Sequence, residues 1–311
     1  MTTLIKAEQL YRYYGRNCAV KNVSFSLSKG EVLGFLGPNG AGKSTTMQML
    51  CGNLAPSSGQ ITINHIDLLD RPKAAKNFLG YLPENPPLYK ELTVQEFLEY
   101  CARLHRIPRN SFKNAIQRAK SRCGLEEVSN RLIANLSKGF QQRVGIAQAI
   151  IHNPEIIVLD EPTSGLDPIQ IREIRALIRE LGEDHGVILS THILPEVQES
   201  CTRVQIINQG ELILNESIAG LKRHMSTASI LVGTRKAVDL DKISNIPEIS
   251  SIETLSGNRL RIHHNIESNP AEKLAETIIG SGWGLLELSP ERRTMEEIFI
   301  DLTSKSNGED G

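Results

Sequence analysis

Short apolar runs that alternate with polar residues fill the first part of the chain, a pattern typical of β-strands. Residues 4–36 contain several such runs, separated by turn-forming residues at 14–17 and 27–30. Shorter runs of the same kind follow at 61–63 and 79–82. We therefore expect strands to dominate this part of the chain, with a sheet over residues 4–36.

A helical pattern replaces the strand-like one between residue 93 and about residue 152. It opens with Thr93 and Glu96, whose spacing is that of a capping box at a helix N-terminus, and apolar residues then recur at helical spacing. Two continuous apolar runs, 156–159 and 187–190, suit strands that are buried on both faces of a parallel sheet. Helices are predicted over 169–181 and 195–201. This order predicts an α/β domain with a helical insertion.

The pattern changes again beyond about residue 225. Strands are predicted at 228–233, 249–255, 259–264 and 283–288, with helices near 236–245 and 270–281. The order βαββαβ suggests a small ferredoxin-like unit. A last helix, 293–303, would place Met295, Ile298, Phe299 and Leu302 on one face.

These segments predict two domains and a tail. The α/β domain covers residues 1–222, with its helical subdomain at about 85–152. A C-terminal α+β domain covers residues 226–303, and the polar residues 304–311 are expected to be disordered. A length of 311 residues agrees with about two domains.

Composition excludes several classes of protein. With 40% hydrophobic and 23% charged residues and a formal net charge of −1, the chain has no global electrostatic reason to bind nucleic acid or an anionic membrane. The five cysteines are scattered and never spaced as CxxC, so we expect reduced thiols and neither a disulfide framework nor a metal site. No signal peptide and no apolar run of about 20 residues is present, so we expect any membrane attachment to come from another protein.

Residues 37–45 read Gly-Pro-Asn-Gly-Ala-Gly-Lys-Ser-Thr and form a complete GxxxxGK[ST] loop. The loop follows the apolar run 32–36 and precedes a predicted helix at 44–50, so backbone N–H groups and the positive end of the helix dipole face one point. The phosphate-binding residues predicted here are Gly37, Pro38, Asn39, Gly40, Ala41, Gly42, Lys43, Ser44 and Thr45. The loop predicts a site for a nucleoside triphosphate.

Individual residues of this loop have separate roles. Glycines at 37, 40 and 42 would let the backbone approach a phosphate closely. Lys43 would reach the β- and γ-phosphates, and the Ser44 hydroxyl is placed to bind Mg²⁺.

A pair of carboxylates follows the predicted strand 156–159. Asp160 and Glu161 lie at its carboxyl end, where an α/β sheet presents groups to a ligand. Asp160 would hold Mg²⁺, and Glu161 would orient and deprotonate the attacking water. An acidic turn before Pro162 has no such meaning alone, but beside a phosphate loop the catalytic interpretation is favoured.

The remaining motifs identify a family. Leu136-Ser137-Lys138-Gly139-Phe140-Gln141-Gln142-Arg143 precedes the carboxylates, Ser164-Gly165-Leu166-Asp167 follows them, and His192 ends the strand-like run 187–191. This ordered set resembles the ATP-binding subunit of ABC transporters over about residues 4–220. The matches are 37–45 with Walker A, 136–140 with the signature motif, 156–161 with Walker B, 164–167 with the D-loop, and His192 with the H-loop. Residues 80–85, 136–140 and 293–299 are similar to the export-type branch of multidrug and gliding-motility ATPases.

The resemblance implies a fold, a reaction and a set of partners. The fold would be that of a P-loop NTPase, and the reaction ATP hydrolysis with Mg²⁺. Two subunits would form a homodimer on ATP binding, with Ser137 and Gly139 contacting the ATP of the partner protomer. The protein would dock on integral membrane permease subunits at the cytoplasmic side of the cell membrane, and nucleic acid would not be a partner.

The resemblance also implies roles for single residues. His192 would touch the γ-phosphate, Asp167 would belong to the D-loop, and Tyr14 would stack on adenine. Glu84 stands where the family usually has a glutamine; it could also bind Mg²⁺, but it adds a negative charge beside Asp160 and Glu161.

Other functions remain as alternatives. The first is a soluble ABC-type ATPase with a non-transport, regulatory role; DNA-repair members of this kind insert a long coiled coil, whereas only 93 residues separate Lys43 from Ser137. Translation-factor members carry two cassettes, and this chain has one. A non-hydrolysing binding protein would not need Asp160, Glu161 and His192, and a GTPase would need an Asn-Lys-x-Asp motif, which is absent.

Overall fold

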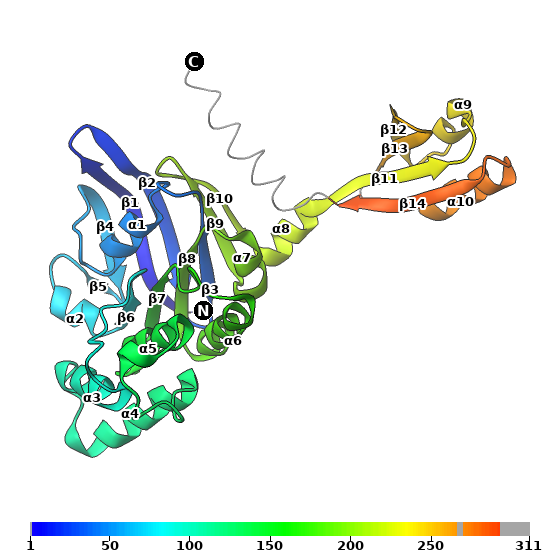
Figure 1. Cartoon of the computed structure of the whole chain (residues 1–311). Coiled ribbons are helices and arrows are strands. Elements are labelled where there is room, and N and C mark those ends of the chain that lie inside the picture. Colours follow the sequence, from blue (N-terminus) through cyan, green and yellow to red (C-terminus); the bar gives the residue numbers. More distant parts are fainter. Residues whose placement is uncertain (1, 266–269, 293–311) are drawn as a thin grey trace. The chain divides into compact units, whose positions relative to one another are not determined.

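The computed structural model describes residues 2–265 and 270–292 (Figure 1). The chain divides into two compact units, Met1–Ile218 and Ala219–Gly311. The division falls at the start of helix α8 (Ile218–Met225). The sequence predicted that the first domain ends at residue 222, which lies in the same helix. Among the described residues, none of the helices combines the length and the apolar character that a bilayer crossing requires.

The first unit contains two sheets. One is antiparallel, with the order β2–β1–β4–β5, and the other has six strands in the order β10–β9–β3–β8–β7–β6. The strands of the antiparallel sheet are β1 (Thr3–Tyr14), β2 (Asn17–Ser28), β4 (Ser58–Ile63) and β5 (Ile66–Asp67). Those of the six-stranded sheet are β3 (Val32–Leu36), β6 (Leu79–Leu82), β7 (Ile156–Asp160), β8 (Gly186–Thr191), β9 (Arg203–Asn208) and β10 (Glu211–Ser217).

The centre of the six-stranded sheet is parallel and fully buried. β3 pairs in parallel with β8 and β9, and β7 pairs in parallel with β6 and β8. Every residue of β3, β7 and β8 is buried, because both faces of a parallel sheet are covered. The α/β prediction, including the two continuous apolar strands, is confirmed.

Two hydrophobic cores lie on opposite faces of this sheet. Alternate residues of β7 show the division: Ile157 and Leu159 pack with the helices, whereas Ile156 and Val158 pack with helix α1 (Lys43–Leu50) and the antiparallel sheet. Side chains alternate across a strand, so a continuous apolar run supplies both cores at once.

The helical core is built from the segment predicted to be helical. Its helices are α3 (Val94–Leu104), α4 (Arg109–Cys123), the short 3₁₀ helix η1 (Ile133–Asn135) and α5 (Lys138–Ile150). The predicted capping box is present, since Thr93 N donates to Glu96 Oε2 (2.8 Å) and Glu96 N donates to Thr93 Oγ1 (3.2 Å). The other helices of the unit are α2 (Pro72–Lys76), α6 (Pro168–Asp184) and α7 (Leu194–Ser200).

The second unit has the predicted βαββαβ order. Its elements are β11 (Ser226–Thr234), α9 (Leu240–Ser244), β12 (Ile249–Leu255), β13 (Arg259–His264), α10 (Ala271–Gly280) and β14 (Leu285–Arg292). The sheet order is β12–β13–β11–β14, and all neighbours are antiparallel. Leu274 and Ile278 of α10 pack on this sheet with Ile230, Val232 and Ile262.

The last strand begins later than predicted. The expected strand at 283–288 starts instead at Leu285, because Gly282 and Gly284 have positive φ angles (+68° and +72°) and end the preceding helix in a turn. The predicted helix at 293–303 and the tail at 304–311 lie outside the described residues.

Candidate active site

The predicted phosphate-binding loop connects β3 to α1. It lies at the carboxyl end of β3, in the parallel part of the six-stranded sheet. Its backbone turns twice through left-handed conformations, at Gly40 (φ +80°) and at Gly42 (φ +103°), the residue before α1 begins at Lys43. A side chain would be strained at either position.

Two of the loop glycines are also required by the surrounding backbone. A Cβ atom at Gly37 would lie 2.3 Å from the carbonyl oxygen of Ile207, and one at Gly42 would lie 2.5 Å from that of Ala19. Close packing on the protein's own backbone is thus a second reason for these glycines, beyond the approach of a phosphate that the sequence suggested.

Lys43 lies inside this loop and is 5% exposed. Its ammonium group donates to the carbonyl oxygens of Gly37 (2.8 Å) and Pro38 (3.1 Å), and it lies 3.5 Å from Glu161 Oε1. These contacts hold the buried ammonium group of Lys43 against the loop backbone, at the N-terminus of α1.

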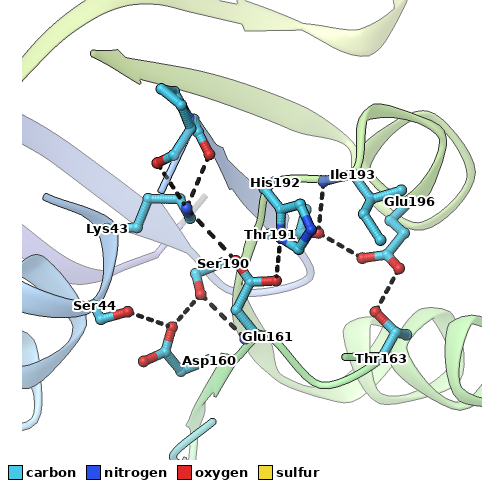
Figure 2. Close-up of polar contacts among 12 residues, drawn as sticks. Lys43, Ser44, Asp160, Glu161, Thr163, Ser190, Thr191, His192, Ile193 and Glu196 are labelled. Atoms are coloured by element: carbon cyan, nitrogen blue, oxygen red, sulfur yellow. Dashed lines mark hydrogen bonds and ion pairs between the residues drawn. The ribbon is translucent and has the colours of Figure 1, made fainter. Parts of the chain in front are cut away.

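Asp160, the last residue of β7, is joined to the loop by hydrogen bonds. Its Oδ1 atom accepts from Ser44 Oγ (3.2 Å) and from Ser190 Oγ of β8. A carboxylate and a hydroxyl therefore lie side by side at the ends of two neighbouring elements (Figure 2).

Glu161 follows directly but points to different partners. It adopts a left-handed backbone conformation (φ +49°) that is uncommon outside glycine. Its carboxylate lies between the ammonium group of Lys43 and the imidazole ring of His192. Oε1 is 3.5 Å from Lys43 Nζ, and Oε2 is 2.9 Å from His192 Nδ1. Figure 2 shows these side chains converging from α1, β7 and the end of β8.

A cavity of about 410 Å³ opens above these groups. Most of the predicted site residues of this region line it: Asn39, Gly40, Gly42, Lys43, Ser44, Thr45, Glu84, Glu161 and His192. Ala19 and Ser164 also line it, and sequence reasoning did not assign them to the site. Ser164 could have been found, since it belongs to the motif at 164–167, whereas Ala19 carries no recognisable signal.

Tyr14 lies apart from these lining residues. It is the last residue of β1, its side chain is 47% exposed, and the guanidinium group of Arg12 lies 4.9 Å from the centre of its ring. The exposed ring therefore already makes a cation–π contact within its own strand.

The predicted site residues Ser137, Gly139 and Asp167 are likewise absent from the cavity lining, and each lies at a helix N-terminus. Ser137 Oγ accepts from Phe140 N (3.4 Å) and caps α5. Asp167 Oδ1 accepts from Ile169 N (3.0 Å) and Gln170 N (2.9 Å) and caps α6. A Cβ atom at Gly139 would lie 2.6 Å from Cδ of Gln170, so glycine permits α5 and α6 to approach.

The cysteines of this region are not nucleophiles. Burial raises the pKa of Cys51, next to α1, and that of Cys201, after α7, so both thiols stay protonated at neutral pH. Within residues 2–265 and 270–292, no group of three or more histidine, cysteine, aspartate or glutamate side chains could hold a metal ion.

The sequence is similar to proteins of one family, the ABC transporters. A protein family described as ABC transporter matches residues 20–164. Over 96% of its length the chain is 36% identical to an uncharacterized ABC transporter ATP-binding protein, YxlF, of Bacillus subtilis, of which it covers 99%. It is 33% identical to the bacitracin transport ATP-binding protein BcrA of Bacillus licheniformis, and 30% identical to the linearmycin resistance ATP-binding protein LnrL of Bacillus subtilis. These matches span 97% of the chain and 98% and 99% of the relatives.

Solved structures resemble part of the chain. The ATP-binding subunit of an ABC transporter superposes with a TM-score of 0.64 at 31% identity, over 71% of this chain and 93% of that one. A dimeric cassette, MJ0796, bound to ADP and phosphate, superposes with a TM-score of 0.62 at 26% identity, over 69% of this chain and 99% of that one.

Proposed function

The chain belongs to the ABC transporter family, and we propose that it hydrolyses ATP at this site to power export through separate membrane subunits. It is an ATP-binding subunit of an ABC transporter, as its family and its full-length relatives indicate. Relatives named for bacitracin transport and for linearmycin resistance favour transport over the alternative of a soluble regulatory ATPase. Resistance to a compound is consistent with its removal from the cell, which is why we propose export.

The observation that carries the proposal is the position of the Glu161 carboxylate, held between Lys43 and His192 at the edge of the cavity. In this proposal the loop backbone and Lys43 bind the phosphates at the N-terminus of α1. Glu161 accepts a proton from the attacking water, and His192 orients Glu161. Because an ionised carboxylate only accepts hydrogen bonds, Nδ1 of His192 carries the proton of this contact and donates it to Glu161.

The residues present fit a magnesium ion. Ser44 and Asp160 offer two oxygen atoms 3.2 Å apart, and Mg²⁺ in nucleotide sites is bound through few protein oxygens together with substrate phosphates. Ser44 and Asp160 would hold such an ion, which would supply positive charge to neutralise the negative charge that develops during phosphoryl transfer. Glu84 lines the same cavity and is a candidate for a further ligand.

We propose that a second protomer completes the site. Ser137 and Gly139 lie at the N-terminus of α5 and Asp167 at that of α6, and none of the three lines the cavity of its own chain. The N-terminus of a helix is suited to bind an anion, so these residues would contact the ATP of the partner in a homodimer. The dimeric cassette MJ0796 is a precedent for such an assembly.

The membrane partner is proposed to be a permease that docks near residues 84–89 on the cytoplasmic side. Tyr89 is 45% exposed there, and its ring packs against Phe97 and Tyr100 of α3. The neighbouring Leu88 packs on the helical core and is only partly exposed. Tyr89 is therefore the better candidate for an apolar contact with the permease.

The substitution Glu161→Gln tests the proposed reaction. The amide keeps the shape of the side chain but removes the base, so we expect ATP hydrolysis to fall by about 10² to 10⁴ while ATP still binds. ATP should then trap a stable dimer, visible by sedimentation. Glu183→Gln, an exposed position on α6, serves as the matched control and should behave as wild type. Hydrolysis at the native rate in Glu161→Gln would refute the mechanism.

A further inference from the structure

A second carboxylate lies buried behind the active site. Glu196, in the first turn of α7, is 1% exposed and accepts hydrogen bonds at both oxygens. Thr163 Oγ1 donates to Oε1, and Thr191 Oγ1 donates to Oε2 (2.6 Å). Both threonines are themselves buried. The three side chains form a bridge (Figure 2), and none of the three residues lines the cavity.

The two ends of this bridge are attached to the two loops that carry the proposed chemistry. Thr163 is two residues after Glu161, and Thr191 directly precedes His192. The Glu161–His192 contact (2.9 Å) joins the same two loops on the cavity side. Two connections therefore join the loop after β7 to the loop after β8. The Glu161–His192 contact is partly exposed at the cavity, whereas the bridge through Glu196 is buried from water.

Thr191 extends this connection to the phosphate loop. Its carbonyl oxygen accepts from Gly37 N (3.4 Å), while its hydroxyl accepts from Ile193 N (3.0 Å) and donates to Glu196. One residue thus links the base loop, the histidine and the first glycine of the phosphate loop. The Thr191 backbone is also held by its pairing with Leu36 of β3, so loss of the side-chain contact with Glu196 should leave the phosphate loop in place.

We propose that Glu196 is a positioning residue that sets the distance between Glu161 and His192, an inference that rests on the function proposed above. Burying a carboxylate costs free energy unless it is fully hydrogen-bonded, and an apolar residue would fill the same space without that cost. Glu196 meets only hydroxyl donors at its two oxygens and makes no ion pair among the described residues. Its bridge constrains two loops whose separation matters for proton transfer, because small misplacements of catalytic groups are costly in rate.

The position predicts a specific kinetic effect. Nucleotide binding depends on the phosphate loop, whereas proton transfer depends on the alignment of Glu161 with His192. Loss of the bridge should therefore lower kcat and leave the affinity for ATP almost unchanged. A residue that merely stabilises the fold would lower thermal stability without this separation of kcat from affinity.

The test measures steady-state ATP hydrolysis and equilibrium ATP affinity of the full chain in three single variants and one double variant. In Glu196→Ala we expect kcat to fall about 10- to 100-fold, with affinity within about twofold of wild type. Glu196→Gln should restore most of the rate, because its amide can accept from one threonine and donate to the other. Thr163→Val removes one arm only; combined with Glu196→Ala it should add no further loss, since that arm then has no partner.

Glu199→Gln is the matched control. It lies on the same helix and replaces the same type of side chain, but Glu199 pairs at the surface with Arg175 (2.9 Å) and should not affect kcat. Wild-type kcat in Glu196→Ala, equal losses in Glu196→Gln and Glu196→Ala, or additive losses in the double variant would each overturn the proposal. If Glu196→Ala does not fold, Thr163→Val, which has nearly the same shape as wild type, must still lower kcat alone. A wild-type protein without ATPase activity would refute the proposed function instead.

Discussion

Asp160 and Glu161 are neighbours in sequence, yet their carboxylates contact different side chains in the site. Asp160 faces Ser44 and Ser190, whereas Glu161 faces Lys43 and His192. Two successive residues of a regular strand would point to opposite faces of the sheet. The left-handed backbone of Glu161 (φ +49°) ends the strand and turns the second carboxylate toward the same cavity edge. One strained residue therefore lets consecutive side chains serve one site.

Lys43 and Ser137 should contribute to different steps. Lys43→Ala removes the only side-chain cation of the loop at 37–45, so we expect strongly weakened binding of Mg-ATP to the monomer. Ser137→Ala should leave monomer binding intact and impair ATP-driven dimerisation. Equilibrium titration and sedimentation distinguish the two effects.

The Ser137 result needs a control for lost helix capping. Removing an N-cap side chain costs about 1 kcal/mol of stability by itself. Thr93→Ala removes the cap of α3, a residue that does not line the cavity, and should destabilise the fold without affecting dimerisation. Equal losses of monomer affinity in Lys43→Ala and Ser137→Ala would contradict the shared site.

His152 makes the stability of the first unit depend on pH. Its Nε2–H donates to the carbonyl oxygen of Leu79 (3.0 Å), and its ring stacks on that of His105 (3.8 Å between centres). Burial, with a smaller effect of His105, lowers the pKa of His152 from 6.5 to about 4. The unfolded chain therefore takes up this proton first as the pH falls, so the stabilisation is complete above pH 6.5 and is lost between pH 6.5 and 4.

Denaturation with urea at several pH values checks this dependence. Wild type should lose about 2 kcal/mol from this group between pH 7.5 and pH 5. His152→Gln should show a smaller loss over the same range. His65→Gln, at an exposed position, should follow the wild type. An unchanged pH dependence in His152→Gln would mean that another group is responsible.

At the scale of elements, close approaches between backbones determine how the helices lie on the central sheet. Gly80 in β6 is an example, because a Cβ atom there would be 2.1 Å from the carbonyl oxygen of Ala149 in α5. Gly182 in α6 instead leaves room for a side chain, since a Cβ atom there would lie 2.3 Å from Cγ2 of Val32 in β3. The helix that carries Ser137 at its N-terminus is thus held against the sheet by contacts near its other end.

Gly80→Ala should therefore destabilise the first unit. The clash is with backbone rather than with a movable side chain, so we expect a loss of about 1 to 3 kcal/mol in the free energy of unfolding by urea. Gly280→Ala in α10 is the matched control, since a Cβ atom there meets nothing within 4 Å and the backbone is not left-handed. Wild-type stability in Gly80→Ala would show that β6 and α5 can separate without cost.

At the scale of the whole molecule, the candidate chemistry lies in one unit. Every residue that lines the cavity, from Ala19 to His192, belongs to Met1–Ile218. The second unit has its own sheet and its own core of apolar side chains. We therefore propose that the second unit regulates or stabilises the dimer and takes no part in ATP chemistry.

A chain shortened after residue 222 should keep its affinity for ATP in a nucleotide titration. All residues that line the cavity remain, and the buried residue Leu221 is retained. Circular dichroism provides the control for folding. A shortened chain that folds but does not bind ATP would show that the second unit contributes to the site.

Much of the first unit could be predicted because its signals are local. The strand at 32–36, the glycine turns and the helix that begins at Lys43 follow one another directly. Continuous apolar runs distinguished β7 and β8 from the helices around them. The βαββαβ order of the second unit was predicted in the same way. The start of β14 was misplaced, because the pattern alone did not reveal that Gly282 and Gly284 both turn the chain.

The order of the motifs along the chain indicated the family through its resemblance to known members. The phosphate loop and the carboxylate pair could be recognised because each consists of residues that are adjacent in the chain. Only the tertiary structure decided which distant groups meet. The order β3–β8–β7 places strand ends from residues 36, 160 and 191 beside one another, and this produces the Glu161–His192 contact and the buried bridge through Glu196. The tertiary structure also shows that Tyr14 is absent from the cavity lining and that Gly37 and Gly42 pack against the carbonyl oxygens of Ile207 and Ala19. A linear pattern encodes local conformation, whereas these contacts depend on how the sheet is assembled.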